Sequence, residues 1–223
     1  MSRWKPNSLR SLLIVGALAL TNCGGSQPPR LFMLSPSVGA GAISDRGSSQ
    51  ADVGVRPGQS LALAQLPSHR RLGVVVTIPQ YLERPDIMVR TGNYEMVPLT
   101  NARWAEGLSL TASRVLAADL GAALPSYEFM ALPTGTDRRF DDRVAVELSG
   151  FETDARGKAE ISGRWTIVDG RSDRETMSRQ FHYAAEASAT DPRSIAEALS
   201  GLLARVSSEI VPGIESSVLA RRG

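Results

Sequence analysis

A nearly continuous run of apolar residues occupies positions 72–78, near the middle of the chain, and ends at Pro79. Such a run, bounded by a proline, is typical of a strand that is covered on both faces. We therefore predict a central strand at this position. Two shorter runs at 87–90 and 94–97 flank the turn-forming residues 91–93 and predict a β-hairpin.

Two other stretches carry apolar residues at spacings of three and four, which is typical of amphipathic helices. The first is predicted to begin near Asn101, with Trp104 in its apolar stripe, and to end before Pro125, because proline cannot continue a helix. The second is predicted to begin at Asp191, whose side chain can cap its first turn. We expect the proline and glycine at 212–213 to break or kink this second helix.

Three later segments, at 143–149, 160–167 and 176–183, alternate between apolar and polar residues. Period two with one polar face indicates an antiparallel meander, and the residues at 154–157 and 169–170 suit its turns. Together these elements predict an α/β fold. It consists of a mixed β-sheet that contains an antiparallel meander, with two long amphipathic helices packed on it, in a single domain.

The N-terminal residues have the pattern of a secretory leader. Three basic residues precede position 11, an uncharged apolar run of nine residues covers 12–20, and Leu-Thr-Asn-Cys follows at 20–23. Nine helical residues rise only about 14 Å, too little to span a hydrocarbon core of about 30 Å. The Leu-x-x-Cys pattern resembles the lipobox of bacterial lipoproteins, in which the leader is cut before an acylated cysteine. Residues 1–22 are therefore predicted to be a lipoprotein signal peptide.

Cys23 is the only cysteine in the chain, so it cannot form an internal disulfide or a cysteine-based metal site. We predict that it is lipidated, and several acyl chains such as palmitate suffice for stable membrane anchoring. The alternative is an incidental free thiol. The next residue is Gly24. In bacterial lipoproteins of the enteric type, an aspartate at this position resembles a signal for retention at the inner membrane. The glycine therefore favours a location on the periplasmic face of the outer membrane.

The predicted mature chain has a short tether and one folded domain. Residues 23–30 form the lipidated tether and 31–223 the domain, with a first strand at 31–34. Residues 36–70 are expected to form a flexible loop, because 36–60 contain five glycines, five serines and two prolines. Alternatively, the whole chain up to residue 70 is tether.

Composition and charge exclude several classes of protein. The apolar share of 42% and the charged share of 22% are close to globular averages, which argues against disorder and against a polytopic membrane protein. The formal charge of +2 includes three basic residues in the predicted leader. Without them, 22 basic residues face 23 acidic ones, so no basic surface for nucleic acid is expected.

The chain carries little catalytic chemistry. Its two histidines, His69 and His182, are expected to be solvated or structural, and no familiar nucleotide-binding, zinc-protease or serine-hydrolase motif occurs. The acids at 141–142 and the pair Asp169 and Asp173 are expected to be solvated beside turns. We therefore predict a non-enzymatic protein with no catalytic residues, no metal and no cofactor. A lipid-anchored enzyme with an unrecognised carboxylate site is one alternative. A free-standing lipid carrier, which needs a closed apolar cavity, is another.

The segments 78–85 and 103–108, taken with the lipobox, 31–34 and 150–152, resemble the ABC-type transport auxiliary lipoproteins, the PqiC-like family once described as a domain of unknown function. The resemblance extends to about residue 219. It implies an envelope lipoprotein that docks a periplasm-spanning MCE-domain protein and works with an ABC transporter or related inner-membrane component in lipid or hydrophobic-solute transport. It also implies assembly into a homo-oligomeric ring.

Tyr81, Leu82 and Arg84 are the candidate partner-binding residues. They follow a buried strand that stops at a proline, so we expect an ordered loop at one end of the sheet, where function tends to lie. Tyrosine and arginine are also favoured as interface anchors. In the equally weighted alternative, Tyr81 and Leu82 fold back onto the core and Arg84 pairs with an acid such as Glu106.

Overall fold

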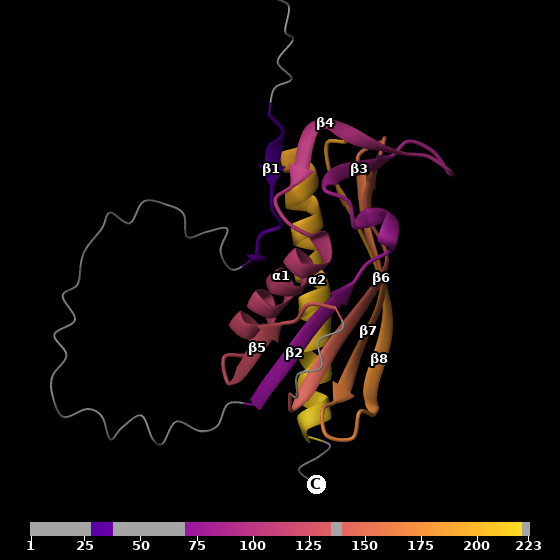
Figure 1. Cartoon of the computed structure of the whole chain (residues 1–223). Helices are drawn as coiled ribbons and strands as arrows, with labels where there is room; N and C mark the ends of the chain where they lie inside the picture. The colour runs from indigo at the N-terminus through magenta and orange to yellow at the C-terminus, as the bar shows by residue number, and fades with distance from the viewer. Residues whose placement is uncertain (1–27, 38–69, 135–139, 220–223) are drawn as a thin grey trace, which may run out of the picture.

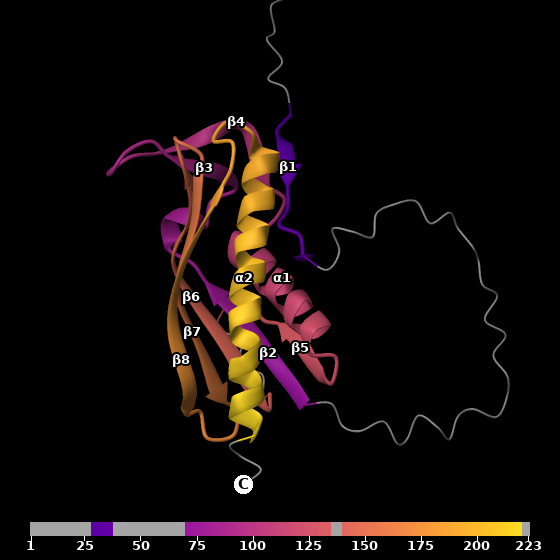
Figure 2. The same ribbon diagram turned by 180° about the vertical axis from the view of Figure 1, so that it is seen from behind.

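The computed structural model describes residues 28–37, 70–134 and 140–219. It is a mixed sheet of eight strands with two helices on one face (Figures 1 and 2). This confirms the predicted α/β fold. In chain order the elements are β1 (Arg30–Phe32), β2 (Arg70–Thr77), the 3₁₀ turn η3 (Gln80–Leu82), β3 (Asp86–Arg90), β4 (Met96–Trp104), α1 (Leu108–Ala123), β5 (Tyr127–Ala131), β6 (Asp142–Asp154), β7 (Lys158–Asp169), β8 (Glu175–Glu186) and α2 (Pro192–Leu219).

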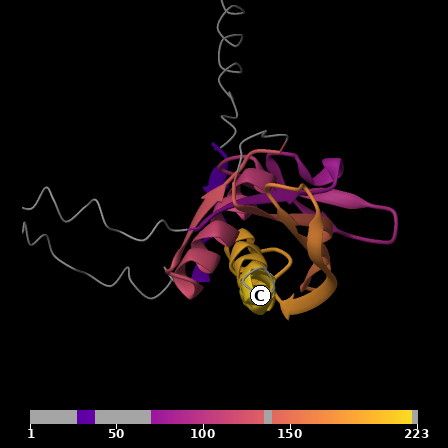
Figure 3. The same cartoon turned by 90° about the horizontal axis from the view of Figure 1, so that it is seen from below.

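The longest strand, β6, organises the sheet because it pairs with three others. One edge pairs along its length with β7, which in turn pairs with β8, and this antiparallel meander was predicted. The other edge pairs with β2 at 142–147 and with β3 at 153–154, both parallel. Strand β5 pairs with the outer edge of β2, and β4 pairs with the outer edge of β3. Strand β1 lies beside β4. Viewed along α2, the sheet curves around the helix (Figure 3).

Strand β2 lies inside the sheet, between β6 and β5, as its apolar run predicted. Leu72, Val74 and Val76 are buried against the helices. On the opposite face an added Cβ at Gly73 would lie 2.6 Å from Leu132 Cδ1, so a side chain there would displace the leucine. The prediction that β2 is central is therefore correct for its burial, although β6 has more strand partners.

The prediction that a helix begins near Asn101 was wrong. Residues 101–104 belong to β4, and α1 begins at Leu108. Ala102 and Trp104 are buried while Arg103 between them is exposed, which is the period of a strand paired with β1. Asn101 also has a φ of 55°, which a right-handed helix cannot contain. Trp104 is a core residue as expected, but it enters the core from strand β4 and not from a helix.

The prediction for α2 was correct at its start, and of the break or kink expected at 212–213 the structure excludes the break. Asp191 Oδ1 accepts a hydrogen bond of 3.1 Å from the backbone N–H of Arg193, so it caps the first turn. The helix is not broken at Pro212, however, and continues to Leu219. The burial of Ile214 beyond the proline offsets the lost backbone hydrogen bond. Gly213 packs closely against the Trp165 ring, because a Cβ added at this glycine would lie 2.9 Å from a ring atom.

Both ends of the predicted 36–70 loop belong to the folded body. The backbone N–H and the hydroxyl of Ser37 donate to Asp119 Oδ1 on α1, at 2.8 and 2.9 Å, and Arg70 begins β2. The rest of that predicted loop, 38–69, lies outside the described residues. So do the predicted signal peptide and Cys23. The predicted first strand is present as β1.

Candidate functional site

The segment between β2 and β3, residues 78–85, is here called the η3 loop. Its single 3₁₀ turn is closed by backbone hydrogen bonds from Leu82 N–H to the Pro79 carbonyl at 2.9 Å and from Glu83 N–H to the Gln80 carbonyl at 3.2 Å. Leu82 is only 4% exposed and packs into the core beneath the turn. A buried leucine and two closing hydrogen bonds give this loop one defined conformation.

The loop is also fastened to β6 through Glu152. The Tyr81 hydroxyl donates to Glu152 Oε2 at 2.8 Å. On the other oxygen, Arg90 Nε donates to Glu152 Oε1 at 2.6 Å, and a second guanidinium nitrogen donates to the same atom. Residues 78–85, the end of β3 and residues 150–152 therefore meet at one place, although they are far apart in the sequence.

The electrostatics of this cluster favour a fixed neutral phenol. Burial and, to a smaller extent, the hydrogen bond to Glu152 together raise the pKa of Tyr81 to about 12. The hydrogen bond to Glu152 also raises the pKa of Arg90 above its ordinary value. At neutral pH the tyrosine is therefore a hydrogen-bond donor and the arginine a cation, a combination suited to holding the loop in place.

The three predicted partner-binding residues occupy different environments. Tyr81 is 42% exposed despite its bond to Glu152, and Arg84 is exposed, whereas Leu82 belongs to the core. The acid suggested as a partner for Arg84, Glu106, forms an ion pair with Arg114 on α1. Tyr81 and Arg84 thus remain available on the surface of an ordered loop.

The roles of Glu152 and Arg90 could not be recognised from local patterns, because both depend on the pairing of β3 with β6. The only available signal was that residues 150–152 contributed to the family resemblance.

The acid pairs weighed as an alternative catalytic site mainly hold strand ends together. Asp142 was expected to be solvated, but it is only 1% exposed and forms an ion pair with Arg70 Nε at 2.6 Å. Its position where β6 starts beside β2 explains the error, because strand pairing buries it. Asp169 Oδ1 accepts two backbone N–H bonds within its own turn. Asp173 is exposed, as predicted, and lies 3.3 Å from an Arg143 nitrogen.

His182 is an exposed residue of β8, 3.6 Å from the carboxylate of Glu160, which agrees with a solvated histidine. His69 lies outside the described residues. Within the part of the chain that the structure describes, no three histidine, cysteine, aspartate or glutamate residues gather closely enough to hold a metal ion.

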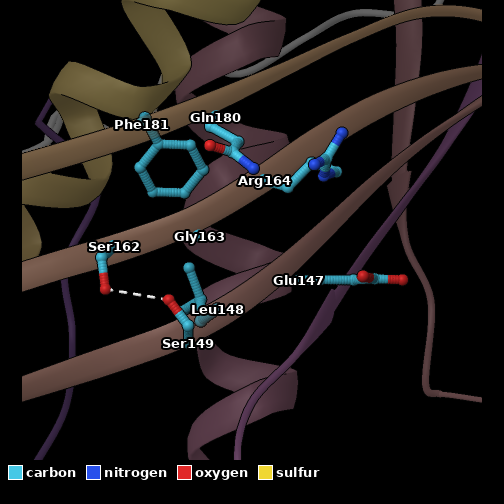
Figure 4. Close-up of a pocket in the computed structure, with 8 residues that line it drawn as sticks. All are labelled: Glu147, Leu148, Ser149, Ser162, Gly163, Arg164, Gln180 and Phe181. Atoms are coloured by element: carbon cyan, nitrogen blue, oxygen red, sulfur yellow. Dashed lines mark hydrogen bonds between the residues drawn. The ribbon is translucent and has the colours of Figure 1, made fainter.

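A depression of about 500 Å³ lies on the meander, where β6, β7 and β8 run side by side (Figure 4). Glu147 and Arg164 lie toward one end of it, and the hydroxyls of Ser149 and Ser162 meet at 3.0 Å toward the other. The depression is open to solvent, so it lacks the enclosure that a lipid carrier needs.

The fold and the site define the class of protein: it is an α/β domain that carries the ordered η3 loop on its surface. Among the described helices, including the 28-residue α2, none has an apolar stretch long enough to cross a bilayer. Comparison with known families matches residues 59–211 to the ABC-type transport auxiliary lipoprotein components. The chain belongs to this family, as the resemblance predicted.

Two curated relatives match part of the chain. The intermembrane transport lipoprotein PqiC of Escherichia coli strain K12 is 28% identical over 92 residues, as is PqiC of Shigella flexneri. Each match covers 41% of this chain and 48% of the relative, so the chain spans about half the length of the curated relatives it matches.

Two solved structures share the fold. A crystal structure of an uncharacterised protein has 26% identity and a TM-score of 0.56, over 67% of this chain and 95% of that one. A Xanthomonas campestris protein has 22% identity and a TM-score of 0.55, over 69% of this chain and 88% of its own. The second likeness supports the fold alone.

Proposed function

We propose that this protein is an outer-membrane lipoprotein that docks a periplasm-spanning MCE-domain protein. It acts without catalysis in a trans-envelope system for lipids or hydrophobic solutes that also includes an ABC transporter or a related inner-membrane component. The observation that carries the proposal is the family match over 59–211. The PqiC relatives, described as intermembrane transport lipoproteins, support the same direction.

The η3 loop is the proposed contact for the MCE partner. Tyr81 and Arg84 are of the residue types that most often anchor interfaces, and both are accessible. Because the bonds to Glu152 and the burial of Leu82 already order the loop, little conformational entropy is lost when a partner binds. A fixed loop with an exposed cation favours a partner surface that contains an acidic group.

Membrane attachment is proposed to come from lipidated Cys23, with residues 1–22 removed as a signal peptide. The presence of Gly24 after this cysteine, in place of aspartate, supports a location at the outer membrane. Several copies assembled as a ring would surround the end of a tube-like partner, and this arrangement is part of the same proposal.

We predict that replacing Arg84 with glutamate weakens capture of the MCE-domain partner at least tenfold, since a like charge then faces the acidic group. The assay cross-links the lipidated protein in intact membranes, purifies it and quantifies co-purified MCE protein by mass spectrometry. The matched control is Arg193→Glu, an exposed charge reversal on α2 far from the η3 loop along the chain.

Equal capture by Arg84→Glu and Arg193→Glu would exclude the η3 loop as the contact. Failure of the unmodified protein to capture any MCE-domain protein would exclude the docking function itself. The enzyme and carrier alternatives have no specific observation in their favour among the described residues: the acid pairs mainly hold strand ends, and the depression is open.

A further inference from the structure

The hairpin of β3 and β4 ends in a short exposed tip, residues 92–94. Thr91 closes it at its base, where its N–H donates to the Glu95 carbonyl at 3.1 Å and its hydroxyl donates to Glu95 Oε2 at 2.7 Å. Tyr94 is fully exposed, at 101%. An added Cβ on Gly92 would meet no atom within 4 Å. The tip is thus an ordered projection that presents an aromatic ring away from the body.

This tip lies at the end of the molecule where the chain enters the fold. Arg90, at the base of the hairpin, pairs with Asp154 at the end of β6, and the following turn is bonded to Ala187 just before α2 begins. Figures 1 and 2 show the entry to β1 and the β3–β4 hairpin in the half of the molecule opposite the C-terminus, with the hairpin projecting to the side of the body. The turn between β7 and β8 lies at the C-terminal end.

The length of the chain before the fold limits how far that end can stand from a membrane. Pro28, the first described residue, lies five positions after Cys23, which gives a reach of at most about 18 Å. The 28 residues of α2 run along the long axis for about 42 Å. A lipid on Cys23 therefore keeps the entry end within about 18 Å of the bilayer, and with that end facing the bilayer the opposite end lies too far away to touch it.

We propose that the hairpin tip, through Tyr94, contacts the headgroup layer of the membrane that anchors the protein. A tyrosine ring with one apolar edge and one hydroxyl suits the boundary between water and acyl chains, where tyrosine and tryptophan are enriched. The contact gives the domain a second attachment point besides the lipid, and so sets the orientation of the η3 loop relative to the membrane. This inference rests on the proposed lipidation of Cys23.

The test places tryptophan at the tip of the lipidated protein. Tyr94→Trp and, as a matched control, Arg171→Trp in the exposed turn between β7 and β8 are reconstituted into phosphatidylcholine vesicles whose acyl chains carry bromine near the headgroup. The unsubstituted protein gives the background fluorescence of Trp104 and Trp165, which are both buried. We expect Tyr94→Trp to show a blue shift and a loss of emission relative to unbrominated vesicles, and Arg171→Trp to show neither.

Flotation of the vesicles and mass spectrometry of Cys23 separate the two proposals. If the lipidated protein floats with the vesicles but Tyr94→Trp is quenched no more than Arg171→Trp, the membrane contact is overturned and the anchoring stands. A blue shift at position 94 without bromine quenching, dependent on protein density, would mean that a second copy covers the tip, and it also overturns the inference. An unmodified Cys23 in protein that does not float overturns both.

Discussion

At the scale of single residues, Glu152 decides whether the η3 loop has one conformation. It is the shared acceptor for Tyr81 and Arg90, so one carboxylate joins the η3 loop, β3 and β6. The sequence shows only an acid just after the predicted strand 143–149, within the segment 150–152 that contributed to the family resemblance. Its role follows from two partners that lie 71 and 62 positions away.

Tyr81→Phe is predicted to flatten the alkaline end of the stability profile. The folded-state pKa of Tyr81, about 12, exceeds its ordinary value of 10.0. The phenol therefore stabilises the folded state fully below pH 10, and this contribution is lost as the pH rises through about 12. Urea unfolding across that window should show a steeper loss for the unsubstituted protein than for Tyr81→Phe.

Tyr183 must be kept in both proteins of that comparison, because its hydrogen bond to Glu209 also raises its pKa. Identical pH profiles for the two proteins would show that the bond between Tyr81 and Glu152 does not form in solution.

At the scale of elements, the attachment of α2 to the meander combines a long apolar face with one polar clamp. Glu209 on α2 accepts a hydrogen bond from Trp165 Nε1 at 3.2 Å and another from the Tyr183 hydroxyl. Arg179 Nε lies 3.8 Å from the same carboxylate, and the Arg205 guanidinium stacks 4.4 Å from the centroid of the Tyr183 ring. The clamp fixes the rotation of α2 on β7 and β8, which apolar burial alone leaves less defined.

Replacing Glu209 with alanine is predicted to lower the free energy of unfolding by about 2 kcal/mol, because the indole and phenol donors lose a charged acceptor. Glu209→Gln should lose less, since the amide oxygen still accepts one bond. Chemical denaturation measures both. The control Glu215→Ala, an exposed site on the same helix, should change stability by no more than about 0.5 kcal/mol. A Glu209→Ala protein as stable as the control would show that the clamp is not formed.

At the scale of the whole molecule, the place where the chain enters the fold bears on how the domain is oriented relative to a membrane. The chain enters beside β4, and the η3 loop lies on the same sheet, fastened to β6. A lipid at Cys23 and a contact at Tyr94 would together hold that sheet in a fixed orientation toward a partner arriving from the periplasm. Docking and anchoring are thus proposed for different surfaces of one rigid domain.

Cys23→Ser is predicted to abolish lipidation and the normal removal of residues 1–22, because an oxygen nucleophile does not replace the acylated thiol. Metabolic labelling with a palmitate analogue, followed by membrane fractionation, should show label and membrane retention only for the unsubstituted protein. Ser35→Ala, a substitution outside the lipobox, is the control and should keep both the label and the membrane retention of the unsubstituted protein. Recovery of processed, membrane-bound Cys23→Ser protein would contradict the prediction.

The sequence by itself determined the fold class, the meander, the hairpin and the start of α2, because period two and the helical spacing report directly which side chains face a core. Tertiary structure alone decided the rest. Residues 101–104 became a strand because β1 was there to pair with them, and α2 passed Pro212 because burial continued beyond it. Asp142 and Glu152 acquired partners through strand pairing. Local patterns record burial, whereas pairing between distant segments depends on where the whole chain places them.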